Sequence, residues 1–261
     1  MKRSSGVRLC ATAAVSALSL ALITGCSDGG SKGSGNAKGT DAAKPAAKAL
    51  SAAELKKLIV AQGEVPGYKV GTVEGGVPDK STLKVADAKC QPVAYAMFAQ
   101  SPADAAAQTS TEVTGNTKKT PTDDASSLDD KSFEDAMKKS MDIDITVVTL
   151  SSYDGDGAEK ALQSLSDGVK ACAGGFSAKP DGDQTKITKI AEEKSSAPGD
   201  ASVAYAATNT ADGEEAVMHI EVVRHGNTLA SYSTMNIGAA MSKKAYTVPA
   251  AVIKAQTAKL K

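Results

Sequence analysis

The last third of the sequence constrains the fold most, because it holds four strand-like segments in succession. They are rich in Val, Ile, Thr and Tyr, and they cover residues 185–192, 203–209, 216–224 and 228–236. The last two flank His225-Gly226-Asn227, a turn sequence in which Gly and Asn tolerate positive φ. Strands that follow one another along the chain favour antiparallel pairing. The order predicts an α+β fold: a mainly antiparallel sheet with helices packed on one face.

Helical segments with recognisable starts surround these strands. Ser51 and Glu54 have the spacing of a capping box, and apolar residues follow at helical intervals. A second helix is expected from Cys90 to Phe98, with a proline in its first turn, and a last one from Pro249 onward. The sequence also predicts a strand at 143–150, a helix at 158–172, a polar loop at 115–131 and a short helix at 132–141.

The first 25 residues have the composition of an export signal. Lys2, Arg3 and Arg8 precede an apolar run at 9–23, and small residues then lead to Cys26. Fifteen helical residues reach only about 22 Å, which is less than the roughly 30 Å hydrocarbon core of a bilayer. We therefore expect a cleaved signal peptide and no membrane-spanning helix.

The sequence Leu-Ile-Thr-Gly-Cys at 22–26 resembles the lipobox of bacterial lipoproteins. The resemblance implies that the Cys26 sulfur carries a diacylglyceryl group and that the signal is cut just before it. At least two acyl chains, such as palmitate, are enough for stable anchoring. The alternative is an incidental thiol after an ordinary signal, although no good Ala-x-Ala cleavage site precedes Cys26. We expect the chain to be exported and lipid-anchored at the outer face of the cell membrane.

Residues 27–49 contain no apolar residue larger than alanine. Such a segment cannot bury enough surface to offset the entropy lost on ordering, so it favours disorder. The sequence thus predicts three parts: a lipoprotein signal peptide at 1–25, the lipidated Cys26 with a flexible linker at 26–49, and a single extracytoplasmic domain at 50–261.

The charge and aromatic content argue against nucleic acid as a partner. The chain has 30 basic and 30 acidic residues, and removal of the first 25 residues takes away three cations and no acid. The remainder is mildly acidic and has no Trp, so it lacks both a basic footprint and stacking surfaces. We expect no nucleic-acid partner.

Cys90 and Cys172 are the two cysteines left after processing and lipidation. An exported protein lies in an oxidising compartment, where an even pair of cysteines favours a disulfide. Two buried thiols or half of a metal site are the alternatives. No His or Cys lies at ligand spacing from either residue, which argues against a metal.

Few residues suggest catalysis. His219 and His225 lie on the predicted hairpin, but a Ser-His-Asp hydrolase also needs a nucleophile on a sharp turn, and no Gly-x-Ser-x-Gly occurs. Paired carboxylates that could hold an ion or exchange protons occur at Asp142 and Asp144 and at Asp154 and Asp156. The second pair runs into a helix too early for an EF-hand. We expect no catalytic residue, no metal and no cofactor.

Four short motifs resemble actinobacterial lipoproteins and the extracellular sensor domains of mycobacterial serine/threonine kinases. The first is a helix that runs into a strand at Val-Pro-Gly-Tyr-Lys-Val (65–70), and the second is a Cys followed by a Pro-led helix (90–98). The third is a helix that ends in Cys (157–172), and the fourth is the predicted hairpin (222–233). The resemblance implies an α+β domain with a curved sheet, disulfides and a surface groove for a ligand. The chain departs from it in having one candidate disulfide instead of two and no kinase.

Together these observations predict a membrane-anchored, non-catalytic lipoprotein that binds a small ligand or a surface protein outside the membrane. One alternative is a carrier of a lipid or another apolar molecule, which requires a large apolar cavity. A third is an extracellular hydrolase, which requires polar groups that converge on His219.

Overall fold

The computed structural model describes residues 47–115, 140–182, 184–211 and 214–260. All of these belong to one compact unit, Ala43–Lys261. The expected signal peptide, Cys26, the linker as far as residue 46, residues 116–131 of the polar loop and most of the helix at 132–141 lie outside the described residues. Among the residues that are described, no helix has the length and hydropathy needed to span a membrane.

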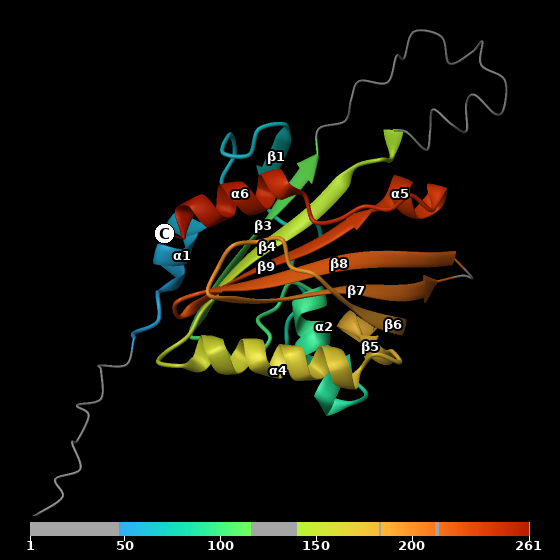
Figure 1. Cartoon of the computed structure of the whole chain (residues 1–261), viewed down its shortest axis with the longest axis horizontal. Helices are drawn as coiled ribbons and strands as arrows, with labels where there is room; N and C mark the ends of the chain where they lie inside the picture. The colour runs from blue at the N-terminus through green and yellow to red at the C-terminus, as the bar shows by residue number, and fades with distance from the viewer. Residues whose placement is uncertain (1–46, 116–139, 183, 212–213, 261) are drawn as a thin grey trace, which may run out of the picture. The chain divides into compact units, whose positions relative to one another are not determined.

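The described strands form one nine-stranded antiparallel sheet, in the order β1-β3-β4-β9-β8-β7-β6-β5-β2 (Figure 1). This confirms the predicted α+β class and the antiparallel pairing. The strands are β1 (Tyr68–Gly71), β2 (Lys84–Val85), β3 (Ala107–Gly115), β4 (Asp144–Ser152), β5 (Phe176–Lys179), β6 (Thr185–Glu193), β7 (Ala201–Ala211), β8 (Glu214–His225) and β9 (Thr228–Asn236).

Helices connect and cover these strands. Their positions agree with the sequence at the capping box, the Pro-led helix, the helix that ends at Cys172 and the C-terminal helix. The helices are α1 (Ala52–Leu58), η1 (Ala88–Cys90), α2 (Gln91–Met97), α4 (Gly157–Ala171), η3 (Pro180–Gly182), α5 (Ile237–Ser242) and α6 (Ala250–Lys259).

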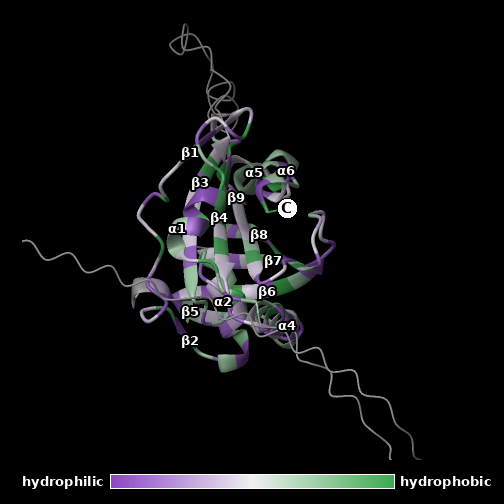
Figure 2. Ribbon diagram, turned by 90° about the vertical axis from the view of Figure 1, so that its left-hand side faces the viewer, coloured by the Kyte–Doolittle hydropathy of each residue, from purple (hydrophilic) through white to green (hydrophobic). Residues whose placement is uncertain are grey.

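The helices lie on both faces of the sheet, so the expectation of a single covered face is wrong. Leu229 and Val222 point into a core with α2 and α4, whereas Ala230, Tyr232 and Val223 point into a second core with α1 and α6. Side chains alternate between the two faces of a strand, so central strands with apolar residues at successive positions need cover on both sides. Figure 2 shows hydrophobic residues recurring along these strands.

Polar side chains fix the helices of the second core. Ser51 caps α1 and forms the predicted capping box with Glu54. Gln256 of α6 is fully buried: its amide oxygen accepts a hydrogen bond from the Val60 amide, and its amide nitrogen donates one to the Leu58 carbonyl. The end of α1 is thereby held against α6.

The hairpin predicted around His225-Gly226-Asn227 is confirmed. His225 pairs with Thr228, so Gly226 and Asn227 form the turn, and Gly226 has φ +60°. A turn of this kind favours residues that tolerate positive φ, which explains the glycine.

Cys90 and Cys172 form a disulfide, with their Cα atoms 5.9 Å apart. It joins the start of α2 to the end of α4, and both sulfurs are buried in the first core. The alternatives of two free thiols and of a half metal site do not apply to this structure.

Residues 47–49, which the sequence assigns to the linker, bind the domain. The Ala47 carbonyl accepts a hydrogen bond from the Gly155 amide, and the Lys48 carbonyl accepts one from the Asn227 side chain. The Ala49 amide donates to Asp154. Chain segments tied by three such bonds belong to the folded domain, which therefore begins at or before residue 47.

Candidate functional site: a split between β8 and β9

The sheet opens at one end, between β8 and β9. Their pairing ends at His219 and Thr234, although β8 extends to Glu214 along β7 and β9 extends to Asn236 along β4. Two strands that keep their outer partners but lose each other must diverge. We call this opening the β8–β9 split; its sides are Glu214–Met218 and Met235–Asn236.

Asn236 directs the chain out of β9. Its side-chain oxygen accepts a hydrogen bond of 2.8 Å from the Ala239 amide and so caps α5. Its side-chain nitrogen donates to Asp142 at 3.0 Å and to Asp144 at 2.9 Å. The two carboxylates that the sequence singled out are therefore brought together, where they hold Asn236 and the start of α5.

Two further contacts fix α5 against the segment before β4. The Gly238 amide donates to the Met141 carbonyl at 2.9 Å. A Cβ atom on Gly238 would lie 2.5 Å from the Asp142 amide nitrogen, so only glycine allows this approach. Lys244 binds Asp142 with its ammonium nitrogen 3.0 Å from a carboxylate oxygen. The position of α5 beside the split is thus set by backbone contact and charge.

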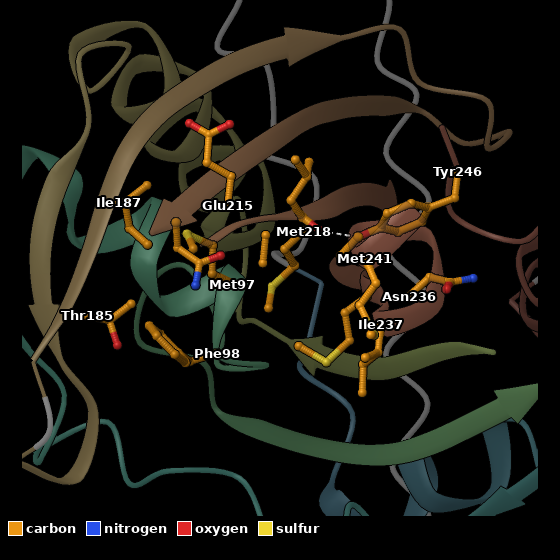
Figure 3. A pocket seen from close by; sticks show the side chains of 15 residues that line it. Met97, Phe98, Thr185, Ile187, Glu215, Met218, Asn236, Ile237, Met241 and Tyr246 are labelled. Carbon is orange, nitrogen blue, oxygen red and sulfur yellow. Dashed lines mark hydrogen bonds between the residues drawn. The ribbon is translucent and has the colours of Figure 1, made fainter. Parts of the chain in front are cut away.

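Tyr246 closes part of the gap that β9 leaves. Its hydroxyl donates a hydrogen bond to the Val217 carbonyl (Figure 3). Burial raises the pKa of Tyr246, so the hydroxyl keeps its proton and remains a donor. The ring meets His219 edge-on, with the ring centroids 4.6 Å apart. His219 in turn lies 2.9 Å from a carboxylate oxygen of Glu193.

One lobe of the site is an apolar pocket of about 670 Å³ on the α2 side of the split, which we call the methionine lobe. Ligand pockets commonly have volumes of roughly 300–1,000 Å³. Four of the chain's seven methionines line this lobe, together with a few aromatic and aliphatic side chains (Figure 3). Its main apolar residues are Met97, Phe98, Ile187, Met218, Met235, Ile237 and Met241.

A second lobe of about 900 Å³ lies on the other face, between β6–β8 and the chain from α5 to Tyr246. We call it the basic lobe, because its walls include three lysines. The two lobes have Glu215, Val217, Ala240 and Tyr246 in common in their walls, and Glu215 and Val217 belong to the split. The polar residues of the basic lobe are Lys189, Glu193, Thr208, Thr210, Glu215, His219, Lys243, Lys244 and Tyr246.

The remaining candidate residues are dispersed. His225 lies at the far end of β8, where burial lowers its pKa. In the described part of the chain, no serine hydroxyl is hydrogen-bonded to His219 or His225. Asp154 accepts a hydrogen bond from the Ala49 amide, and Asp156 pairs with Lys160. The described ranges contain no group of three His, Cys, Asp or Glu residues that could hold a metal ion.

Sequence reasoning missed α5 and the methionine lobe. A local signal for α5 existed: Asn236 is a favoured helix cap, and Ile237, Ala240 and Met241 follow at helical spacing. No local signal marks the split, because it depends on where β9 stops pairing with β8.

Comparisons with known proteins find a similar solved structure but no matching family model. No family model matches the sequence, and neither does any curated protein. Among solved structures, the chain is similar to the extracellular domain of PknH from Mycobacterium tuberculosis, with 12% identity and a TM-score of 0.48. The alignment covers 82% of this chain and 97% of that one. This is the kind of domain that the four sequence motifs resemble, but a likeness so distant carries no function to this chain.

Proposed function

We propose that this chain is an exported, lipid-anchored protein whose non-catalytic domain binds a small molecule with an apolar portion in the β8–β9 split. The anchor is the lipidated Cys26, and the domain lies outside the membrane. The Cys90–Cys172 disulfide supports an oxidising compartment. The methionine lobe favours the carrier-like form of ligand binding, in which an apolar molecule is taken up by the domain.

One observation carries the proposed binding activity. Within the described residues, the large hydrophobic residues most exposed to solvent are Met235, Ile237 and Met241, with 40%, 49% and 47% of their surface accessible. All three line the methionine lobe. Single exposed apolar residues are ordinary, but their gathering at one pocket is typical of a binding surface. Methionine side chains also adapt to ligands of varied shape.

Photolabelling of the full chain in phosphatidylcholine vesicles tests binding. The probe is hexadecanol that carries a diazirine in its chain, and the adducts are mapped by peptide mass spectrometry. We expect adducts on the peptides that contain Met218 and 235–241. Met241→Glu should abolish most of this labelling, because it places a charge in the apolar lobe. Ala173→Glu, at an exposed position outside both lobes, is the matched control. The proposal is contradicted if the yield of adducts is the same in Met241→Glu as in the wild type, or if the adducts lie on other peptides.

The anchor has a separate test. In cells fed an alkynyl palmitate, we expect the alkynyl acyl group to become attached to the wild-type chain and to the Cys10→Ala variant, but not to the Cys26→Ala variant. Cys10 lies within the expected signal peptide, so its loss leaves the acylated residue intact. Equal tagging of the Cys26→Ala variant would show that the sulfur of Cys26 is not the attachment point.

A further inference from the structure

This inference rests on the proposed function and concerns the ligand. We propose that the molecule bound in the split is a single-chain amphiphile with an anionic head group. Its apolar chain occupies the methionine lobe, and its head group lies in the basic lobe on the opposite face of the sheet. The ligand therefore passes between β8 and β9 where these strands have separated.

The strand geometry provides such a path. Successive side chains of β8 point to opposite faces, so Met218 lines the methionine lobe while His219 lines the basic lobe. Beyond His219, β9 no longer pairs with β8, so backbone hydrogen bonds between these strands do not separate the two faces. Val217, Ala240 and Tyr246 line both lobes, so a ligand that occupies both would pass beside these residues.

The charges favour an anion in the basic lobe. Two polar groups of its wall have carboxylate partners: Lys244 binds Asp142, and His219 contacts Glu193. Lys189 and Lys243 form no ion pair with any described residue, and both side chains are exposed at the lobe. Glu215 is the acidic wall residue that is not engaged by a described cation. A carboxylate or phosphate in this lobe would meet two ammonium groups without displacing an existing pair.

The apolar lobe sets the complementary requirement. Its only charged wall residue among those described is Glu215, which belongs to both lobes. An anionic head placed there would lose its hydration without gaining a cation, which is unfavourable. An acyl chain loses only contact with water, and its burial is favourable. The two lobes therefore orient an amphiphile in one direction.

The test compares two photoreactive probes on the full chain in phosphatidylcholine vesicles. Hexadecanoic acid and hexadecanol, with the diazirine at the same carbon, differ only in the head group. We expect the acid to label 235–241 more strongly than the alcohol at equal vesicle loading. The double variant Lys189→Glu and Lys243→Glu should lower labelling by the acid about tenfold, which corresponds to the loss of one to two modest charge contacts. It should leave labelling by the alcohol unchanged.

The controls separate this inference from the proposed function. The double variant Lys57→Glu and Lys254→Glu makes the same charge change on α1 and α6, away from both lobes. It should alter neither the labelling by the acid nor the labelling by the alcohol. Equal labelling by acid and alcohol, or equal effects of the two double variants, overturns the anionic head group but leaves apolar binding intact. Absence of labelling by both probes overturns the proposed function itself.

A third probe distinguishes the source of the negative charge. A photoreactive monoacylglycerol phosphate of the same chain length offers a phosphate instead of a carboxylate. The probe whose labelling depends more strongly on Lys189 and Lys243 identifies the head group. Lysine-dependent labelling by either acid supports the inference, and lysine-independent labelling by both contradicts it.

Discussion

The two ends of the β8–β9 hairpin differ in how they are held together. At the turn, the strands pair without interruption from His225 and Thr228 to His219 and Thr234, and Leu229 and Tyr232 are fully buried on opposite faces. At the other end the strands separate. There, side chains before and after α5, such as Asn236 and Tyr246, make the contacts that hold this region together. The same two strands thus serve as core at one end and as the walls of a pocket at the other.

This difference shows where the molecule can open. Paired strands with cores on both faces resist local opening, whereas segments with exposed apolar surface and few buried contacts do not. At the split, a few polar side chains replace the ladder of backbone hydrogen bonds, chiefly Asn236 and Tyr246. Binding regions are commonly drawn from the less stable parts of a fold. The following predictions measure how independent the two ends are.

Removal of the disulfide should have the largest effect on the packed part of the molecule. The bridge spans 82 residues, and the chain-entropy model assigns to such a loop a loss of about 4.5 kcal/mol in the free energy of unfolding. Urea unfolding of the Cys90→Ala, Cys172→Ala double variant measures this loss. In the absence of urea, the photoreactive hexadecanol should still label the methionine lobe of this double variant. A loss below about 1 kcal/mol would contradict the assigned role.

Truncation of apolar side chains compares the two ends of β9 directly. Leu229→Ala should lower the free energy of unfolding by about 3 kcal/mol, because it leaves a cavity in the core of α2 and α4. Met235→Ala should cost less than about 1 kcal/mol, since that side chain is 40% exposed. Thermal or urea unfolding gives both values. Similar losses at the two positions would show that the split is packed as tightly as the turn.

Removal of the Tyr246 hydroxyl tests whether the split can open independently of the paired end of β8. Tyr246→Phe leaves the ring against His219 but leaves the Val217 carbonyl without this donor, which should cost about 1 kcal/mol. Hydrogen exchange at 214–218 should become faster, while exchange at 220–225 stays the same. Tyr95→Phe, on α2, is the control. Uniform acceleration along β8 would mean that the two ends open together.

A pH effect at the turn should be the smallest. Burial lowers the pKa of His225, so the folded state disfavours the imidazolium. The unfolded chain binds a proton near its ordinary pKa of about 6.5, and the free energy of unfolding should therefore fall as the pH drops through that value. His225→Gln should flatten the profile between pH 7.5 and the folded pKa. If the free energy of unfolding changes with pH equally in wild type and variant, His225 is not the group responsible.

Local signals in the sequence were sufficient for several elements. Ser51 with Glu54, Pro92 after Cys90, and Gly226 with Asn227 each mark a helix start or a turn through their own chemistry. The structure has these features where the sequence predicts them. The strands of the last third could also be predicted from the sequence, because their β-branched and aromatic residues recur within segments that the sequence analysis bounds at 185–192, 203–209, 216–224 and 228–236.

Other features depend on distant parts of the chain. The second core joins Val, Leu, Ile and Tyr side chains from segments far apart in the sequence, such as α1, β4 and α6, and its position depends on how these segments pack. This is why helices were expected on one face only. β2 and β5 are too short, at two and four residues, to show a period. The split requires knowledge of three strand pairings at once, and the acylation of Cys26 stays a prediction.

The hydrogen bond from Asn227 to the Lys48 carbonyl has a mechanical consequence. The chain enters the domain beside the hairpin turn, and Val217 lies eight residues along β8, or roughly 26 Å away. Under the proposed anchor, the linker therefore joins the domain at the turn end of the hairpin, where β8 and β9 are paired. The β8–β9 split lies at the opposite end of the same hairpin, so the proposed binding activity places ligand entry away from the point of attachment.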